Sequence, residues 1–272
     1  MLNLTVKSKI IVSLILMCFV SIAIIGFLGY SKGKKSLEEA NSNKLVSVRS
    51  ARAMQIEDYF STIRKQIKTF SENRMIVDAM RGFKPAFHNV IKEKSITKEQ
   101  IKEYSKSVKK YYNEEYLSEL HGNQDKDRQR GIDAYWTDED AVIYMQYKYI
   151  SANKHSKGNK HNLDAAEDGS QYAKLHKLYH PVVRSYLEEF GYYDIFLIDD
   201  KTGHIVYSVY KEADYGTSLT TGPYSNTNFA EVMKQAANSN EKGFIKLIDF
   251  RNYEPSYDKP ASFIAAPIYD GD

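Results

Sequence analysis

Two histidines, His176 and His180, lie four residues apart, and this spacing places both side chains on one face of a helix. Paired imidazoles at this spacing bind zinc in metalloproteases, where a glutamate follows the first histidine and a third ligand completes the site. No glutamate follows His176, and no third ligand is evident. We therefore predict two exposed histidines and no metal site. The chain also lacks a phosphate-binding loop and a convincing pair of catalytic carboxylates, so we expect neither an enzyme nor a cofactor.

The helix that carries these histidines is predicted over residues 171–190. Pro181 lies within the pattern and predicts a kink or a break, whereas Gly191 predicts the end of the helix. Apolar side chains mark one side of this helix, at Tyr172, Leu175, Tyr179, Val182, Val183, Tyr186 and Leu187.

An uncharged apolar run over residues 10–29 is the most informative segment of the 272-residue chain. A helix of this length spans about 30 Å, which is the hydrocarbon thickness of a bilayer. A cleaved signal peptide is the alternative, but its apolar region is usually shorter, at about 7–15 residues. We predict a cytoplasmic head at residues 1–9, a transmembrane helix at 10–30 and the remainder outside the cell. Cys18 is the only cysteine, so the rest of the chain has neither disulfides nor thiolate metal sites.

A long helix is predicted over residues 36–83, because no proline or glycine interrupts this stretch before Gly82. We expect it to continue the membrane span outward as a stalk. Its apolar stripe consists of Ala53, Ile56, Phe60, Ile63, Ile67 and Phe70. The stripe could pack on the protein's own domain or on a second copy of the chain, and both alternatives remain open.

The middle of the chain is predicted to be mainly helical, so that residues 31–187 form a helical stalk and a helical sensor region. One helix is expected over residues 95–120, with a cap signal around Thr97, and another over 138–149. Residues 121–131 are predicted to be a loop. The polar stretch 151–170 is expected to be flexible and exposed.

The pattern changes from helical to extended near Gly191. Strands are predicted over residues 194–198 and 204–210, joined by an Asp-Asp-Lys-Thr-Gly turn. A short helix over 226–237 and two strands over 244–250 and 262–268 complete the pattern. The fold class is therefore α+β, with residues 188–272 as an antiparallel sheet domain.

Several segments resemble the Cache sensor domains of bacterial transmembrane receptors, a group that includes methyl-accepting chemotaxis proteins, histidine kinases and nucleotide cyclases. The resemblance rests on GYYDIFLIDDKTGHIVYSVYKEADYGTSL, GPYSNTNFA, PASFIAAPIYDG and MQYKYISAN. It implies a PAS-like sheet whose final strand lies between the first and the fourth. That strand is missing here, so we expect the sequence to stop in mid-domain and two central strand edges to be unpaired, at residues 195–198 and 262–268.

The resemblance also implies a small-molecule pocket between the sheet and the segments that cover it, residues 211–230 and 249–257. The candidate ligand-binding residues there are Tyr207, Lys211, Asp214, Tyr224, Asp249, Arg251 and Tyr253. Arg251 and Lys211 would bind a carboxylate, and Asp249 or Asp214 an amine. The Arg-x-Trp-Tyr element of amino-acid-binding Cache domains is not matched, which argues against an amino-acid ligand.

The function that these features predict is the extracytoplasmic ligand-sensing portion of a bacterial chemoreceptor-like protein in the inner membrane, with its main domain periplasmic or extracellular. The alternatives are the sensor of a histidine kinase or nucleotide cyclase, a membrane-anchored periplasmic enzyme, and an adaptor that assembles through its stalk. Expected partners are a small-molecule ligand, the lipid bilayer and a second copy of the chain bound through the stalk. Nucleic acid is not an expected partner, because the membrane anchor places the main domain outside the cytoplasm and no convincing basic face with stacking aromatics is evident.

Overall fold

The computed structural model describes residues 5–271. The chain divides into two compact units, one ending at Ile63 and the other beginning at Arg64. Most of the described residues are helical, and the strands lie near the C-terminus.

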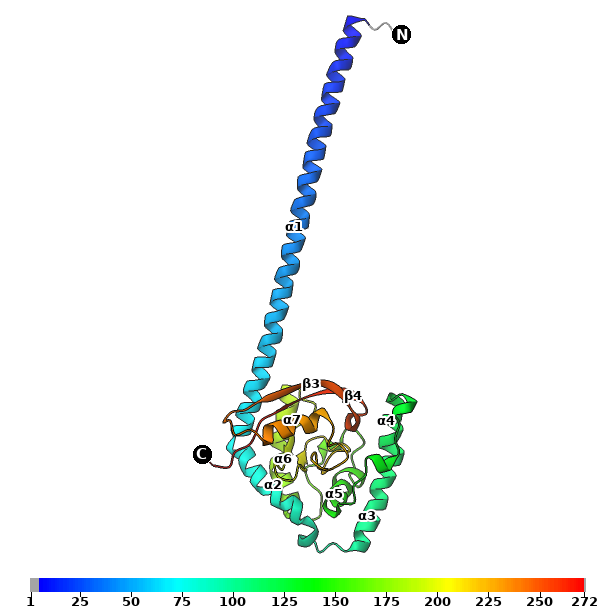
Figure 1. Ribbon diagram of the computed structural model, residues 1–272, viewed down its shortest axis with the longest axis vertical. Helices are drawn as coiled ribbons and strands as arrows, with labels where there is room; N and C mark the ends of the chain where they lie inside the picture. Colours follow the sequence, from blue (N-terminus) through cyan, green and yellow to red (C-terminus); the bar gives the residue numbers. More distant parts are fainter. Residues whose placement is uncertain (1–4, 272) are drawn as a thin grey trace. The chain divides into compact units, whose positions relative to one another are not determined.

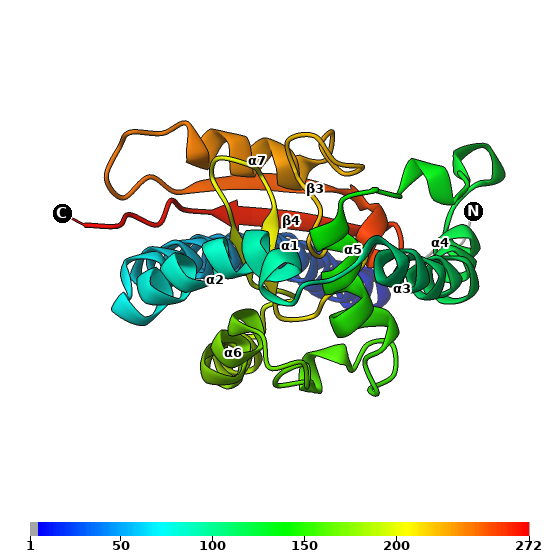
Figure 2. The same cartoon turned by 90° about the horizontal axis from the view of Figure 1, so that it is seen from below.

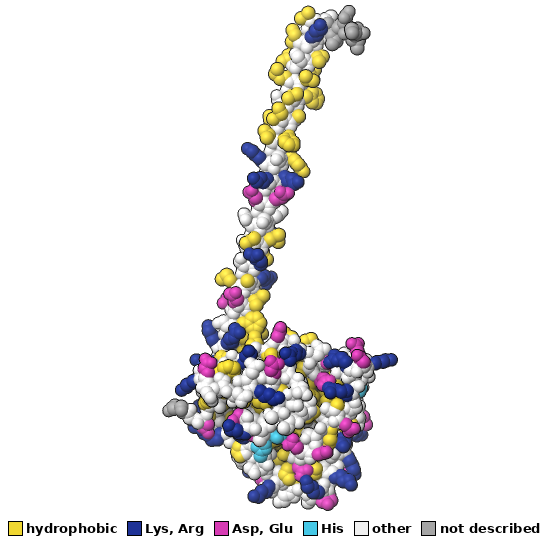
Figure 3. All heavy atoms as spheres, in the orientation of Figure 1, with side chains coloured by type: hydrophobic (Ala, Val, Ile, Leu, Met, Phe, Trp, Pro, Cys, Tyr) yellow, Lys and Arg dark blue, Asp and Glu magenta, His cyan; other side chains and the backbone are white. Residues whose placement is uncertain are grey.

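The first unit is formed by most of helix α1 (Val6–Glu72), which Figure 1 shows as one uninterrupted helix. The side chains of the apolar run are exposed; Phe19 and Phe27, for example, retain 69% and 72% of their accessible surface. Figure 3 shows these apolar side chains along the helix, with lysines only before and after them. By length and composition, α1 is the one helix among the described residues that could cross a membrane. The prediction that the apolar run and the stalk form one continuous helix is confirmed.

The predicted helix over 36–83 is wrong at its end, because α1 stops at Glu72 and a second helix, α2 (Arg74–Glu93), begins after Asn73. Asn73 has extended backbone angles, and its side chain accepts a hydrogen bond from the Met75 amide at 2.8 Å. An asparagine at this position caps a new helix. The apolar periodicity continues on both sides of the break, so the sequence pattern alone concealed it.

Two short helical regions follow. The first consists of α3 (Lys98–Tyr111), the π-helical turn η1 (Tyr112–Tyr116) and α4 (Leu117–Asn123); the second consists of α5 (Asp140–Gln146) and the π-helical turn η4 (Tyr147–Ser151). Single 3-10 turns lie at η2 (Lys126–Arg128), η3 (Ile132–Ala134), η5 (Lys160–Asn162) and η6 (Glu254–Ser256). The predicted cap at Thr97 is confirmed, since Thr97 and Gln100 form a reciprocal capping box.

The prediction that residues 151–170 are flexible and exposed is wrong at several positions. Lys160 is buried, and its ammonium group donates to the Ile150 carbonyl at 2.8 Å. Asn153 is also buried and donates to the carbonyls of Tyr149 and Lys160, both at 3.0 Å. Polar composition suggested a solvated loop, but these side chains instead pair with backbone carbonyls that would otherwise be unsatisfied.

Helix α6 (Gln171–Phe190) has the predicted bounds, with Ser170 as its N-cap and Gly191 ending it in the left-handed conformation at φ 69°. The helix continues through Pro181 without a break. Its buried face includes His176 and His180, which are fully buried, so the prediction that they are exposed is wrong. Carbonyl groups of the preceding polar stretch contact both rings: that of Asp164 lies 2.5 Å from Nδ1 of His176, and that of His161 lies 2.6 Å from Nε2 of His180.

The strands form two separate antiparallel pairs. Strand β1 (Phe196–Ile198) pairs with β2 (Ile205–Ser208), and β3 (Lys246–Tyr253) pairs with β4 (Lys259–Ala265). All four predicted strands are present. The last two extend further into the predicted connection than expected, which leaves only residues 254–258 as the turn. Within the described residues no strand joins the two pairs into one sheet.

Helix α7 (Asn228–Ala237) packs against both strand pairs. The Phe229 ring stacks on Phe263 of β4 with centroids 4.4 Å apart and lies 4.6 Å from Phe196 of β1. Figure 2 shows α7 on one side of β3 and β4, with α2 on the other. The two strand pairs are therefore held between layers of helix, although they are not hydrogen-bonded to each other.

Candidate functional site

The loop that follows β2, residues 209–217 and hereafter the charged loop, brings ionisable side chains into the protein interior. Lys211 and Asp214 retain 1% and 0% of their accessible surface. Lys211 adopts a left-handed backbone conformation, φ 60°, and its amide donates to the Ser208 hydroxyl at 2.8 Å. The loop then returns to the hairpin, where the Gly216 amide donates to the Ile205 carbonyl at 3.2 Å. This path explains how a charged sequence enters the core.

Asp194, just before β1, holds the start of the charged loop. One carboxylate oxygen accepts hydrogen bonds from the amides of Val209 and Tyr210 at 2.9 and 3.1 Å, and the other accepts from the Ser208 hydroxyl at 2.7 Å. Burial raises the pKa of Asp194 to about 6, although these hydrogen bonds favour the ionised form. Asp194 therefore fixes the start of the charged loop to the segment just before β1.

Lys211 is a buried ammonium group with few compensating contacts. It donates to the Val209 carbonyl at 2.9 Å, and its nitrogen lies 5.9 Å from the ring centroids of both Tyr149 and Tyr207. Burial lowers the pKa of Lys211 to about 7, and the negative charge of Asp194 opposes this shift. The side chain is therefore poised between its charged and neutral forms near neutral pH.

Glu212 and Asp214 form an acidic pair on the same loop. Glu212 accepts hydrogen bonds from the hydroxyls of Tyr193 at 2.5 Å and Ser256 at 2.8 Å, and Asp214 accepts from the Tyr253 hydroxyl at 2.7 Å. Burial, together with the charge of the nearby carboxylates, raises the pKa of Glu212 to about 8 and that of Asp214 to about 7. Among the described residues, neither carboxylate forms an ion pair, and Oδ1 of Asp214 has no hydrogen-bond partner.

The acidic pair is surrounded by aromatic and amide side chains from distant segments. The Tyr112 hydroxyl donates to the Ala213 carbonyl at 2.8 Å, and the Gln146 amide donates to the carbonyls of Ala213 and Tyr215 at 3.1 and 2.9 Å. These groups come from η1 and α5 and were not predicted as site residues. The tyrosine-rich stretch 104–116 was the available signal, but its role depends on tertiary packing.

The buried histidines satisfy most of their polar atoms without a metal. The His180 ring donates from Nε2 to the His161 carbonyl at 2.6 Å, and its Nδ1 accepts from the Tyr207 hydroxyl at 2.7 Å. Burial and the nearby charge of Lys211 lower the pKa of His180 to about 2, so this ring is neutral. No group of three metal-ligating side chains occurs between residues 5 and 271.

Five of the seven predicted ligand-binding residues are buried, and two are not. Tyr253 contacts Asp214 directly, and the Tyr224 hydroxyl lies 3.3 Å from the Tyr116 hydroxyl. The buried members are Tyr207, Lys211, Asp214, Tyr224 and Tyr253. Asp249 and Arg251 are exposed on β3, where Arg251 forms an ion pair with Glu231 of α7 at 3.2 Å. Arg251 is exposed whereas Lys211 is buried, so the structure does not bring these two proposed carboxylate-binding side chains into the same environment.

The sequence contains one match to a serine-hydrolase motif. The residues Gly29-Tyr-Ser-Lys-Gly33 match G-x-S-x-G, the sequence of a nucleophile elbow, but they lie inside α1 and are exposed. A nucleophile elbow requires a sharp turn between a strand and a helix, with an acid and a histidine nearby. Ser31 has none of this context, so it is not a catalytic candidate.

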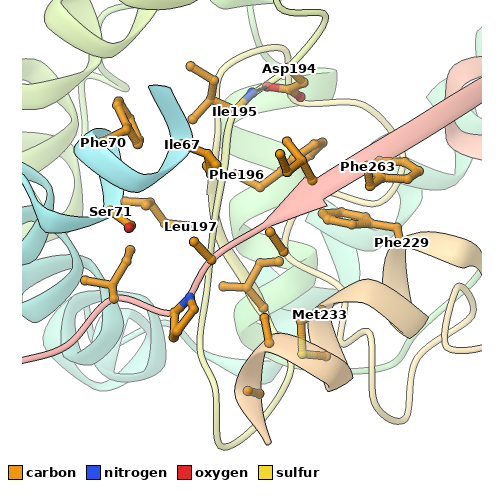
Figure 4. A pocket seen from close by; sticks show the side chains of 18 of the residues that line it. Ile67, Phe70, Ser71, Asp194, Ile195, Phe196, Leu197, Phe229, Met233 and Phe263 are labelled. Atoms are coloured by element: carbon orange, nitrogen blue, oxygen red, sulfur yellow. Dashed lines mark hydrogen bonds between the residues drawn. The ribbon is translucent and has the colours of Figure 1, made fainter. Parts of the chain in front are cut away.

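A separate cavity of about 820 Å³, hereafter the strand-edge cavity, lies between β1 and β4. Figure 4 shows Ile67 and Phe70 of α1 at this cavity, together with Phe229 and Met233 of α7 and Phe263 of β4. The cavity lining also includes six charged residues, which are Arg81, Lys84, Asp194, Asp200, Lys259 and Asp270. Tyr193, Tyr253 and Ser256 also line it, which places the cavity next to the acidic pair.

No family model matches the chain, and comparisons with curated proteins and with solved structures found no match.

Proposed function

We propose that this protein is the ligand-sensing portion of a bacterial transmembrane receptor, with α1 in the cell membrane and the unit that begins at Arg64 outside the cytoplasm. A Cache-type, PAS-like fold and a chemoreceptor-like role are parts of the same proposal. The observation that carries it is the continuity of α1, since one helix contains both the apolar run and the last turns packed into the folded unit. Any change that shifts those turns would act directly on the membrane segment.

The last turns of α1 contact the segment that leads to the charged loop. The Tyr192 hydroxyl donates to the Gln66 side chain at 2.6 Å, and the rings of Phe70 and Tyr186 lie 4.8 Å apart. Tyr192 is two residues from Asp194, which binds the charged loop. This short connection supports a mechanism in which the state of the charged loop biases the position of α1.

The chemistry of the charged loop favours a small polar ligand. Asp214 presents a buried carboxylate oxygen without a partner, which suits an amine, and Lys211 is a buried ammonium group that suits a carboxylate. Tyrosine side chains surround the acidic pair and would supply apolar walls and hydroxyl groups. We propose binding as the role of these groups, and we assign no catalytic step to them.

A second copy of the chain is the proposed partner for the exposed part of the α1 stripe, at Ala53 and Ile56. These apolar positions have helical spacing and face solvent. The same arrangement would suit a chemoreceptor, a histidine kinase or a nucleotide cyclase, because each transmits a shift of a membrane helix.

Thermal-shift screening of the full chain in detergent, against polar metabolites that carry an amine or a carboxylate, tests the ligand proposal. A ligand at 100 times its Kd should raise the unfolding free energy by about 2.7 kcal/mol. Asp214→Asn should abolish the shift for amines, and Lys211→Met should abolish it for carboxylates. The control Asp133→Asn changes an exposed carboxylate and should preserve it. A shift that survives in both site variants would contradict this location.

Cysteine labelling tests the orientation independently. A variant with Cys18→Ser and Lys154→Cys should react with a membrane-impermeant maleimide on intact cells, since Lys154 is exposed in the folded unit. The matched variant with Cys18→Ser and Lys7→Cys should react only after lysis. The reverse pattern, or recovery of the protein in the soluble fraction, would rule out the proposed topology.

A further inference from the structure

The turn between β3 and β4 lies against the acidic pair. We propose that this turn, residues 254–258 and hereafter the lid, opens to admit ligand to the charged loop, and that two arginines hold it closed. Both arginines belong to residues 123–130, hereafter the strap. The proposal rests on the proposed function in assigning a ligand to the charged loop, but movement of the lid is measured without any ligand.

The inner side of the lid contacts the acidic pair. The Ser256 hydroxyl donates to Oε2 of Glu212 at 2.8 Å, and Tyr253, the last residue of β3, donates to Oδ2 of Asp214 at 2.7 Å. Asp214 retains none of its accessible surface. A ligand therefore reaches this carboxylate only after a covering segment has moved.

The outer side of the lid is bound by the strap. Both terminal nitrogens of Arg128 donate to the carboxylate of Asp258, each at 2.7 Å, and Nη2 of Arg130 donates to both oxygens of Glu254, also at 2.7 Å. The side chains of Arg128 and Arg130 remain 43% and 55% exposed, whereas that of Asp258 is only 2% exposed. The strap thus lies between the lid and solvent.

Two consecutive lid residues have strained backbone conformations. Tyr257 and Asp258 are left-handed, at φ 58° and 62°, and residues other than glycine rarely adopt this region. Such conformations persist where surrounding contacts hold them. Here the Asn123 amide donates to the Tyr257 carbonyl at 3.0 Å, in addition to the pairing of Asp258 with the strap. Loss of the strap contacts therefore favours a rearrangement of the lid.

The boundaries of the lid allow it to open without unpairing the strands. The ladder between β3 and β4 ends with the pair of Tyr253 and Lys259, which directly precede and follow the lid. Within the lid, the Tyr257 amide donates to the Glu254 carbonyl at 2.9 Å, so the turn has its own internal hydrogen bond. The lid can therefore move as a unit about its two ends while the strands stay paired.

The test measures hydrogen exchange of the full chain in detergent. The variants Arg128→Gln and Arg130→Gln each remove one charged contact of the strap, and Arg128→Lys keeps the charge but loses the paired hydrogen bonds. The matched control Arg74→Gln removes an exposed arginine that pairs with Asp78 on α2. Exchange is followed in the lid and in residues 211–217, with the amides of α6 as the reference for folding.

Both glutamine variants should exchange at least about tenfold faster than the wild type in the lid and in residues 211–217. Arg128→Lys should give an intermediate rate, and Arg74→Gln should match the wild type. Unchanged exchange in the glutamine variants, or faster exchange in the lid alone, would overturn the lid as a cover of the charged loop. Equal acceleration in α6 would overturn it too, because the whole unit would then be unfolding. Absence of any thermal shift with amines or carboxylates is a separate result, which contradicts the proposed ligand and not the movement of the lid.

Discussion

The Tyr253 hydroxyl donates a hydrogen bond of 2.7 Å to Oδ2 of Asp214, while Oδ1 of the same carboxylate has no partner. This bond connects β3 to the charged loop. Because both residues are buried, the Tyr253 hydroxyl offsets part of the cost of removing this carboxylate from water.

Tyr253→Phe should therefore destabilise the protein by about 1–3 kcal/mol, the usual cost of leaving a buried acceptor unsatisfied. Urea unfolding monitored by circular dichroism measures the change. Tyr59→Phe removes an exposed hydroxyl and should have no measurable effect. A loss below about 0.5 kcal/mol in Tyr253→Phe would mean that the Asp214 carboxyl finds other donors.

The pH dependence of stability should report the raised pKa of Asp214, about 7, against about 3.9 in the unfolded chain. Between these values the folded state retains a proton that the unfolded state has lost. The stability contributed by this group is thus present below about pH 4 and is lost as the pH rises through 7.

Asp214→Asn removes this titration, so its stability relative to the wild type should increase by about 2 kcal/mol between pH 5 and 7. Urea unfolding of both proteins across this range measures the difference, in which the contributions of Lys211 and the histidines largely cancel. A difference that does not change with pH would indicate an ordinary pKa for Asp214.

Asp194→Ala should loosen the charged loop, because the amides of Val209 and Tyr210 and the Ser208 hydroxyl lose their acceptor. We expect a loss of about 2–4 kcal/mol in the unfolding free energy, and faster proteolysis within residues 208–217. The control Asp133→Ala removes an exposed carboxylate and should change the stability by less than about 0.5 kcal/mol. Unchanged proteolysis in Asp194→Ala would show that other contacts order the loop.

Alanine substitutions at two glycines with similar backbone angles distinguish the cost of conformational strain from the cost of steric contact. Gly203 and Gly158 have φ 74° and 79°, but a Cβ atom on Gly203 would meet the hydroxyl of Thr220 and lie 2.8 Å from its amide nitrogen, whereas one on Gly158 would meet nothing within 4 Å. Gly158→Ala should therefore cost about 1 kcal/mol, and Gly203→Ala at least about 3 kcal/mol. Similar losses in thermal unfolding would contradict the packing at the hairpin turn.

Local patterns were sufficient to predict much of the secondary structure. Helix α6 has the predicted bounds because Ser170 caps it and Gly191 ends it, and both effects act within a few residues. The hairpin of β1 and β2 is likewise encoded by apolar strands and the turn between them. Asn73 is the exception, since a capping asparagine inside a continuous helical pattern is easily missed.

The candidate site was only partly accessible from the sequence. Lys211, Asp214 and Tyr253 are chemically conspicuous, and they are buried near the hairpin. Their neighbours Tyr112 and Gln146 lie far from the charged loop in the sequence, so no spacing rule connects them to it. The sequence also does not show that Arg251 is exposed, because strand alternation and the ion pair with Glu231 decide which way it faces.

The sequence by itself determined the long apolar helix, the order of the helices and strands, and the hairpin of β1 and β2. Hydrophobic periodicity, helix caps and turns are local properties, so they can be recognised without the tertiary structure. Tertiary structure alone decided that two histidines are buried, that an acidic pair lies within a tyrosine-rich interior, and that β1 and β4 border one cavity. Burial and hydrogen-bond pairing depend on segments a hundred or more residues apart, as the bond between Tyr112 and Ala213 illustrates. Those long-range contacts set the pKa values of the buried groups from which a function can be proposed.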